Sequence, residues 1–184
     1  TTGAYLTVPV SGASVWGAYT NVINSGTRIG YKDGSQSATI AGTVTGNTSS
    51  LEIGNWPVGG DYDTIGYIDE FRISSTARSA DWIATEYNNQ NSPGTFYSLN
   101  SETARSAVNI AGDNISTDWY TPPAGGGAGT DWKYRRKITV DHTKVPNTDQ
   151  SEFPMLVKIA DSTDPIFTKA QADGDDILFT NSQG

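Results

Sequence analysis

The sequence of 184 residues contains no cysteine, which excludes disulfide bridges and thiolate metal sites. Histidine and methionine occur once each. Lysine and arginine together number 12 against 20 acidic residues, so the formal net charge is −8. Because phosphate groups are bound by basic surfaces, this balance makes nucleic acids and anionic membranes poor partners. No apolar run approaches the roughly 18 residues that a membrane-spanning helix needs, so direct insertion into a membrane is not expected.

Small and aromatic residues are plentiful by contrast. The chain has 20 glycines, five tryptophans and nine tyrosines, while charged residues make up only 17%. Many short strands separated by glycine-rich turns produce such a composition, which is typical of extracellular β-modules. We therefore expect an all-β protein, an antiparallel jelly roll or β-sandwich with one short helix and a second, partial β-domain.

The first section, residues 1–100, is predicted to hold most of the strands. Asp33-Gly34 predicts a hairpin turn, because glycine adopts positive φ at little steric cost. Ser79 as an N-cap and Asp81 in the first turn predict the start of a short helix, which Asn88-Asn89 and the following Ser92-Pro93-Gly94 would end. A last extended piece is expected at 95–99. The patterns of alternating polarity predict earlier strands at 5–10, 16–23, 28–34, 37–44, 50–56 and 65–73.

Two further sections follow. Residues 101–130 contain two prolines followed by a glycine run, and this composition predicts a linker. Residues 131–184 are predicted to form a partial β-domain with strands at 132–140, 153–159 and 176–180. Three strands make a thin core. We expect either a slice of a longer tandem protein or a permuted unit whose halves are completed by neighbouring chains.

Asp69 is the least expected residue of the predicted strand 65–73. Alternation places it on the apolar face with Tyr67 and Phe71, and a buried carboxylate needs hydrogen-bonding or charged partners. We considered a catalytic, a metal-binding and a structural role. Asp69 and its neighbour Glu70 would point to opposite faces, so they cannot form the carboxylate pair, about 5–5.5 Å apart, of a retaining glycosidase. The structural role is favoured, with Asp69 accepting from the turn at 74–78 or pairing with Arg78.

Two other kinds of site are candidates. Calcium prefers hard oxygen ligands, which the carboxylates of Asp61 and Asp63 and of Asp173, Asp175 and Asp176 could supply. The competing interpretation is ordinary Asp-Gly turn chemistry. Exposed aromatic residues beside glycine-rich loops are candidates for binding glycans. These residues are Trp16, Trp56 and Tyr62, for which the alternative is a place in the core. The single histidine, His142, is expected in a solvated loop.

Several stretches resemble a known family. Residues 66–74 (GYIDEFRIS), 77–83 (ARSADWI) and 87–88 resemble the closing motif of laminin-G-like, concanavalin A-like jelly rolls. Residues 28–34 and 51–54 (LEIG) are similar to earlier strands of that family, so the resemblance covers about 16–99. Residues 132–140, 153–157 and 173–180 are similar to the start of an uncharacterised β-domain. That domain accompanies such jelly rolls in bacterial and archaeal surface proteins.

The resemblance implies a non-enzymatic extracellular module of a large surface protein, which binds carbohydrate or mediates adhesion. The alternative is a structural subunit of a self-assembling surface fibre or layer, or of a phage tail fibre, completed by β-strands of neighbouring repeats or chains. A glycoside hydrolase is the third hypothesis. The expected partners are glycans, other surface proteins or further copies of the chain. The expected location is secreted, at the cell surface or at a virion surface, and calcium is the one cofactor considered.

Overall fold

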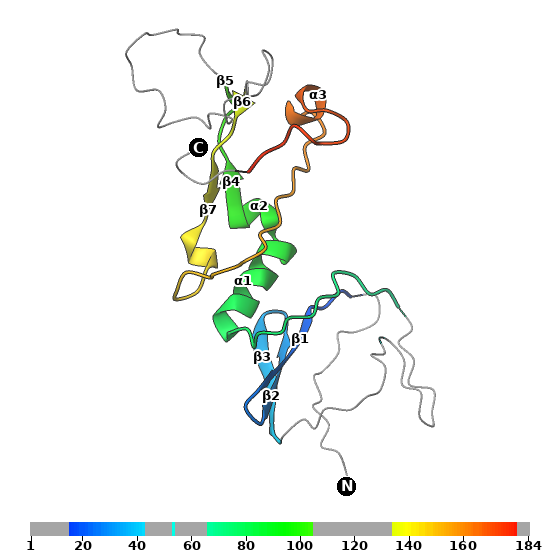
Figure 1. The fold of residues 1–184 in the computed structure, drawn as a ribbon, viewed down its shortest axis with the longest axis vertical. Coiled ribbons are helices and arrows are strands. Elements are labelled where there is room, and N and C mark those ends of the chain that lie inside the picture. Colours follow the sequence, from blue (N-terminus) through cyan, green and yellow to red (C-terminus); the bar gives the residue numbers. More distant parts are fainter. Residues whose placement is uncertain (1–14, 43–52, 54–65, 105–133, 180–184) are drawn as a thin grey trace, which may run out of the picture. The chain divides into compact units, whose positions relative to one another are not determined.

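A computed structural model describes residues 15–42, 53, 66–104 and 134–179 (Figure 1). The chain divides into two compact units, and each is treated by itself below. The first unit comprises Thr1–Asn91 and Thr143–Pro154, and the second comprises Ser92–His142 and Met155–Gly184. All sheets in the described ranges are antiparallel and the helices are few and short, so the predicted all-β class is confirmed. Among the described helices, none has the length and apolar character to cross a membrane.

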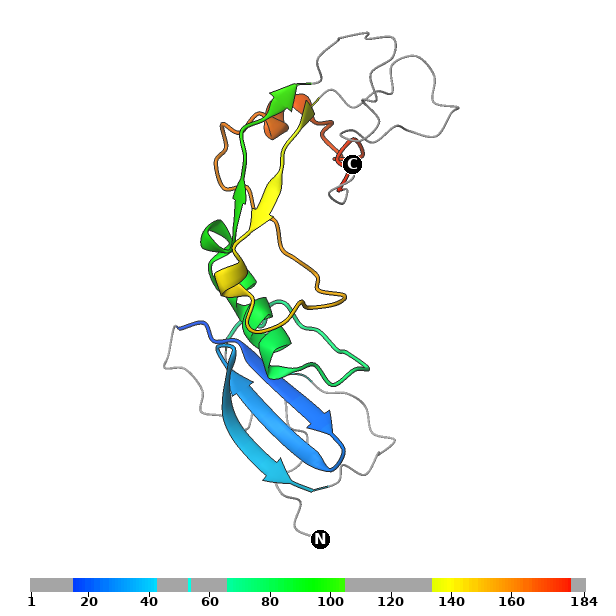
Figure 2. The ribbon, with the colours of Figure 1, turned by 90° about the vertical axis from the view of Figure 1, so that its left-hand side faces the viewer.

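The first unit contains a three-stranded meander (Figure 2). Its strands are β1 (Tyr19–Asn24), β2 (Thr27–Lys32) and β3 (Ser35–Ala41). Ser25-Gly26 and Asp33-Gly34 connect them, and all four residues have positive φ. Paired positive φ values are the geometry of a tight hairpin turn whose twist matches that of the strands. The predicted strands at 16–23, 28–34 and 37–44 are confirmed with bounds shifted by a few residues; the strand predicted at 5–10 lies outside the described residues.

Helix α1 (Ala80–Asn91) covers this sheet and closes its core. The Ser79 hydroxyl accepts a hydrogen bond from the Trp82 amide at 3.1 Å, as the capping signal predicted. Ile83 packs against Val22 and Tyr31 to form the buried cluster. The helix continues past Asn88-Asn89, where Asn89 is only 1% exposed, and ends at Asn91, directly before the predicted stop Ser92-Pro93-Gly94. Burial of the Asn89 side chain overrides its weak helix propensity, so the helix continues to Asn91.

A strap of chain from far along the sequence completes the first unit. Residues Thr143–Pro154, called the strap below, belong to this unit although they were predicted to lie in the partial domain 131–184. The strap starts within the 3-10 helix η2 (His142–Lys144). It ends beside α1, where the Phe153 ring meets Trp82 edge-on with ring centroids 5.6 Å apart. The predicted boundaries therefore do not follow the division of the structure.

The second unit is built on two short antiparallel pairs. Strand β4 (Tyr97–Leu99) pairs with β7 (Ile138–Val140), and β5 (Thr103–Ala104) pairs with β6 (Tyr134–Arg135). Residues 95–99 were expected to return to the first sheet, but Pro93–Phe96 forms the short helix α2 and β4 pairs within the second unit. The predicted boundary at residue 100 thus cuts through a continuous run of pairing. The Pro- and Gly-rich segment connects β5 to β6, which are paired strands of one unit.

Two predicted strands of the second unit are absent from the described sheets. Burial alternates along 153–160 as predicted, with Met155, Val157 and Ile159 half-buried and the residues between them exposed, but no ladder is formed. The physical reason is that the backbone of Lys158 is bonded by a side chain. The Lys158 amide donates to the Tyr97 hydroxyl at 2.6 Å, and this hydroxyl donates to the Lys158 carbonyl at 2.6 Å. A side chain thereby occupies backbone groups that a neighbouring strand would use. Residues 171–177 form turns, and helix α3 (Ile166–Lys169) precedes them.

Candidate functional site

Asp69 lies in an exposed, irregular segment, so the prediction of a buried carboxylate on a core strand is wrong. Residues 66–73 are exposed and form no strand. Glu70 has a φ of 52°, and a left-handed residue breaks the two-residue alternation on which the predicted face depended. The Asp69 carboxylate accepts a hydrogen bond from the Glu70 amide at 2.8 Å. The strand predicted upstream, at 50–56, lies outside the described residues except for Ile53.

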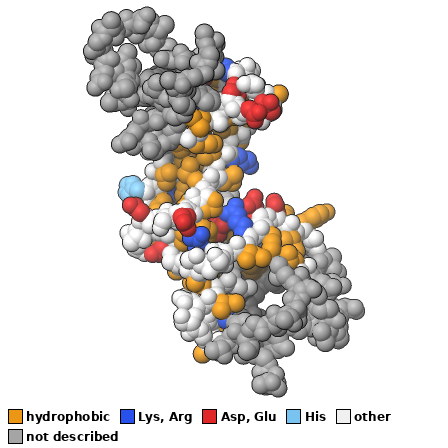
Figure 3. All heavy atoms as spheres, viewed as in Figure 1, with side chains coloured by type: hydrophobic (Ala, Val, Ile, Leu, Met, Phe, Trp, Pro, Cys, Tyr) orange, Lys and Arg blue, Asp and Glu red, His pale blue; other side chains and the backbone are white. Residues whose placement is uncertain are grey.

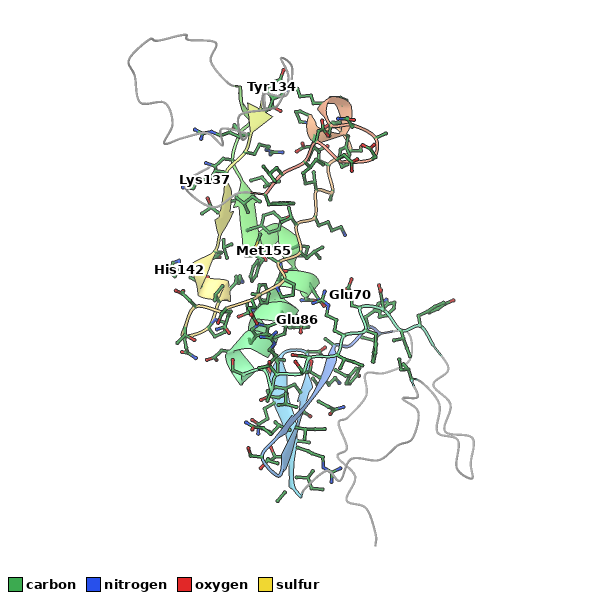
Figure 4. The ribbon with its side chains drawn as sticks, viewed as in Figure 1. Glu70, Glu86, Tyr134, Lys137, His142 and Met155 are labelled. Carbon is green, nitrogen blue, oxygen red and sulfur yellow. The ribbon has the colours of Figure 1, made fainter. Side chains whose placement is uncertain are left out.

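Arg72 ties this segment to helix α1. Its guanidinium lies 2.6 Å from a Glu70 carboxylate oxygen and 2.6 Å from a Glu86 carboxylate oxygen (Figure 4). One cation is thus shared by two acids at the surface of the first unit, and the three groups together keep one negative charge. A general acid or nucleophile needs a carboxylate free to reach substrate, and this pairing makes Glu70 a poor candidate.

Arg78 was predicted to partner Asp69, but its contacts lie elsewhere. One guanidinium nitrogen is 3.9 Å from the Glu152 carboxylate of the strap. The guanidinium also lies over the Trp82 ring, 4.8 Å from its centroid, in a cation–π arrangement. Arg78 therefore packs the start of α1 and the end of the strap together, and it does not hold Asp69.

Large apolar side chains are exposed on the same segment. Tyr67 is 89% exposed, and its apolar neighbours along the segment are also more than half exposed. Figure 3 shows hydrophobic side chains gathered at the surface of the molecule. The exposed large apolar residues of the segment 66–73 are Tyr67, Ile68, Phe71 and Ile73. A run of exposed large apolar residues is characteristic of a surface that binds something else.

Trp16 is the predicted glycan-binding residue that the structure describes. It is 68% exposed, so the alternative interpretation as a core residue does not hold for it. It precedes β1, and the backbone two residues later is fixed by Asp33. The Asp33 amide donates to the Ala18 carbonyl at 2.8 Å, and the Ala18 amide donates to the Asp33 carboxylate at 3.0 Å. Trp56 and Tyr62, the other two candidates, lie outside the described residues.

The acidic cluster of the second unit is used for turns. The Asp176 carboxylate accepts from the Gln171 amide at 2.8 Å, and the Asp173 carboxylate accepts from the Asp175 amide at 3.3 Å. Within the described ranges, no three acidic or histidine side chains come together in a way that could hold a metal ion. These hydrogen bonds support the turn interpretation for Asp173 and Asp176, and calcium binding by Asp173, Asp175 and Asp176 stays a prediction. Asp61 and Asp63 lie outside the described residues.

An ion pair that sequence reasoning missed organises the second unit. Asp164 is buried, accepts the Ile166 amide at 3.0 Å with one oxygen and pairs with the Arg136 guanidinium through the other. Arg136 also donates to the Asn100 carbonyl at 2.9 Å. The Ile166 amide first, and the Arg136 guanidinium second, hold the pKa of Asp164 below its ordinary value. The only signal in the sequence was Asp164-Pro165 ahead of a short helix.

Two remaining features carry no acid–base chemistry. An open apolar depression of about 420 Å³ in the second unit is lined by Met155, Leu156, Val157 and Phe179. Its lining has no titratable side chain, so it offers an apolar surface and not a reaction centre. His142 is exposed, as predicted, but it begins the 3-10 helix η2 after β7 (Figure 4).

The family comparison covers part of the first unit. Residues 3–84 match a laminin G family model, described as the concanavalin A-like lectin/glucanases superfamily. The predicted resemblance to laminin-G-like, concanavalin A-like jelly rolls is thus confirmed for this stretch, which includes the meander and the first turns of α1. The resemblance was expected to cover about residues 16–99. The match begins earlier, at residue 3, and ends earlier, at residue 84. No curated protein and no solved structure is found to match the chain.

Proposed function

We propose that the chain is a non-enzymatic module that binds carbohydrate or mediates adhesion, with Trp16 on its ligand-binding surface. The observation that carries the proposal is the exposed indole of Trp16 within the stretch that matches the lectin and glucanase superfamily. Under this proposal the module acts outside the cell, on a cell or virion surface. Its partners are glycans or glycosylated surface proteins.

The setting of Trp16 suits such a role. An exposed indole offers a flat apolar face together with a polar N–H, which matches the alternating apolar and polar surfaces of a sugar ring. The reciprocal hydrogen bonds between Ala18 and Asp33 fix the chain two residues away. A ligand-binding group on a pre-ordered backbone loses less conformational entropy on binding, and this favours affinity.

A glycoside hydrolase is disfavoured by the acidic residues nearest to the family motif. A glycosidase needs two carboxylates facing each other across a substrate cleft. Asp69 hydrogen-bonds the adjacent backbone, and Glu70 is paired with Arg72, so these two groups do not face each other across a cleft. If the chain were a hydrolase, it would release reducing sugar from a polysaccharide that it binds, which a colorimetric assay would detect.

A second function has its own supporting observation. The exposed apolar residues of the segment 66–73 lie on a stretch whose sequence alternates like a strand. Large apolar side chains exposed at a surface favour association with another chain. A structural subunit of a surface fibre or layer is therefore the alternative, and it predicts high-mass species without any glycan.

A glycan array with matched variants tests the proposal. We expect specific retention of the native chain on a subset of glycans, and loss of that retention in Trp16→Ala. Tyr67→Ala removes a second exposed aromatic of the same unit and should leave retention unchanged. Equal retention of Trp16→Ala and the native chain would remove Trp16 from the ligand surface. Absence of retention on every glycan would reject carbohydrate binding as such.

A further inference from the structure

The strap holds helix α1 through a small set of contacts. The Asn147 amide donates to the Asp81 carboxylate at 3.0 Å, and the Asn88 amide donates to the Lys144 carbonyl at 2.9 Å. The edge-on contact between Phe153 and Trp82 is the apolar part of this interface. One face of α1 thus binds a segment of the same chain, the strap.

The strap is connected to the rest of the first unit only through the second unit. The chain leaves the first unit between Asn91 and Ser92, returns as the strap after His142, and leaves again between Pro154 and Met155. Pro93, the first residue of α2, lies just after the boundary between Asn91 and Ser92. No peptide bond therefore joins α1 directly to the strap, and the contacts between them are non-covalent throughout.

We infer that the strap of one copy docks on α1 of a second copy, so that the chain associates by exchange of the strap. An exchanged strap would make the same hydrogen bonds and the same aromatic contact as the intramolecular one, and such exchange is a low-cost route to association. Because each copy carries both an α1 surface and a strap, the contact is either reciprocal, which gives a dimer, or sequential, which gives a chain of copies.

Concentration decides between the closed and the exchanged form. Docking within one chain has an effective concentration on the order of millimolar for short connections, so the closed form dominates in dilute solution. Refolding from denaturant at high protein concentration should trap the exchanged form. The net charge of −8 adds repulsion between copies, so physiological salt should favour exchange. This inference does not rest on carbohydrate binding.

The absence of cysteine from the sequence allows a clean cross-linking test. Full-length chains carrying Asp81→Cys and, separately, Asn147→Cys with a mass tag are unfolded, mixed, refolded at high concentration and treated with a short bis-maleimide. We expect a cross-linked species with one chain of each kind, increasing several-fold between dilute and concentrated refolding. The matched control replaces Asn147→Cys by Ser37→Cys, on the exposed part of β3, which reports random collision.

The outcomes separate the inference from its alternatives. Mixed cross-links at the level of the Ser37→Cys control, at every concentration, would overturn strap exchange. A double variant with both cysteines in one chain should then give only cross-linked monomer. Phe153→Ala in the Asn147→Cys chain should reduce the mixed product, because it removes the apolar contact with Trp82. Far-UV circular dichroism of each variant checks that a loss of product is not a loss of fold.

Discussion

Substitution of Gly34 by alanine is the sharpest probe of how the hairpin meets helix α1. Gly34 has a φ of 76°, and an L-residue held in the left-handed region costs about 1–2 kcal/mol. A β-carbon at Gly34 would lie 2.9 Å from the β-carbon of Tyr87, which real side chains do not tolerate without movement. Forcing an extra carbon into such a contact costs a further 1–3 kcal/mol, roughly. We expect Gly34→Ala to lower the free energy of unfolding by about 2–5 kcal/mol in total.

Gly174 supplies the matched control. Its φ of 77° is almost the same as that of Gly34, but the nearest atom to a new β-carbon is the Ile177 Cδ1 at 3.8 Å, an ordinary contact. Gly174→Ala should therefore cost only the backbone part, about 1–2 kcal/mol. The difference between the two variants isolates the close approach of the turn to Tyr87. Replacing Tyr87 by alanine should not rescue Gly34→Ala, because the nearest atom is the β-carbon that alanine retains.

The assay must resolve the two units, since these glycines lie in different ones. Hydrogen exchange in increasing urea, read by mass spectrometry on peptides from each unit, gives a local free energy of opening. We expect the peptides of β2 and β3 to lose protection in Gly34→Ala, and those of residues 166–179 to lose less in Gly174→Ala. Equal losses in the two variants would refute the argument that Tyr87 closes over the turn.

Two further predictions concern the second unit. Tyr97→Phe removes a buried hydroxyl that bonds both backbone groups of Lys158, so we expect a loss of about 1–3 kcal/mol in urea denaturation, and an unchanged midpoint would show that the contact is not made. Asp164 has a lowered pKa in the folded chain, chiefly because the Ile166 amide and then Arg136 stabilise its carboxylate. Its contribution to stability is therefore fully present above the unfolded pKa of about 3.9, and it is lost as the pH falls through the lowered folded value. Asp164→Asn should lower the melting temperature near neutral pH and make it fall less as the pH is lowered from 5 through and below the unfolded pKa of about 3.9. Parallel pH profiles of variant and native chain would contradict this.

Local signals in the sequence predicted local structure well. Asp33-Gly34 predicted the β2–β3 turn, because few residue pairs accept positive φ at both positions. Ser79 predicted the start of α1, because a hydroxyl at that position satisfies an amide that the helix leaves open. The family motif identified the class of the first unit, and the composition predicted the dominance of strands.

Features that depend on long-range contacts were not predictable in the same way. The strap contacts α1 across more than fifty residues of sequence, and no local pattern marks Asn147 as a partner of Asp81. The strand at 65–73 was predicted from alternation alone, but Glu70 takes positive φ and Arg72 draws its carboxylate towards α1. Alternation reports which residues could share a face, and a strand forms only where a ladder partner is also available.

Pairing of β4 with β7 was missed for a related reason. A segment rich in proline and glycine separates the two strands in sequence, and such composition is equally compatible with a linker between domains and a connection between paired strands. Which of the two occurs depends on the strands at its ends, and β4 is only three residues long. Short strands carry too little periodicity to predict their partners.

Calorimetric titration of glycans selected on the array tests the central claim most directly. If the Trp16 indole covers about 40–80 Å² of a sugar ring, its removal should cost about 1–2 kcal/mol. The proposal therefore predicts a dissociation constant about five- to thirtyfold weaker for Trp16→Ala than for the native chain. It also predicts an unchanged constant for Tyr67→Ala. Native affinity in Trp16→Ala, or no heat of binding with any glycan, would contradict the proposed carbohydrate-binding surface.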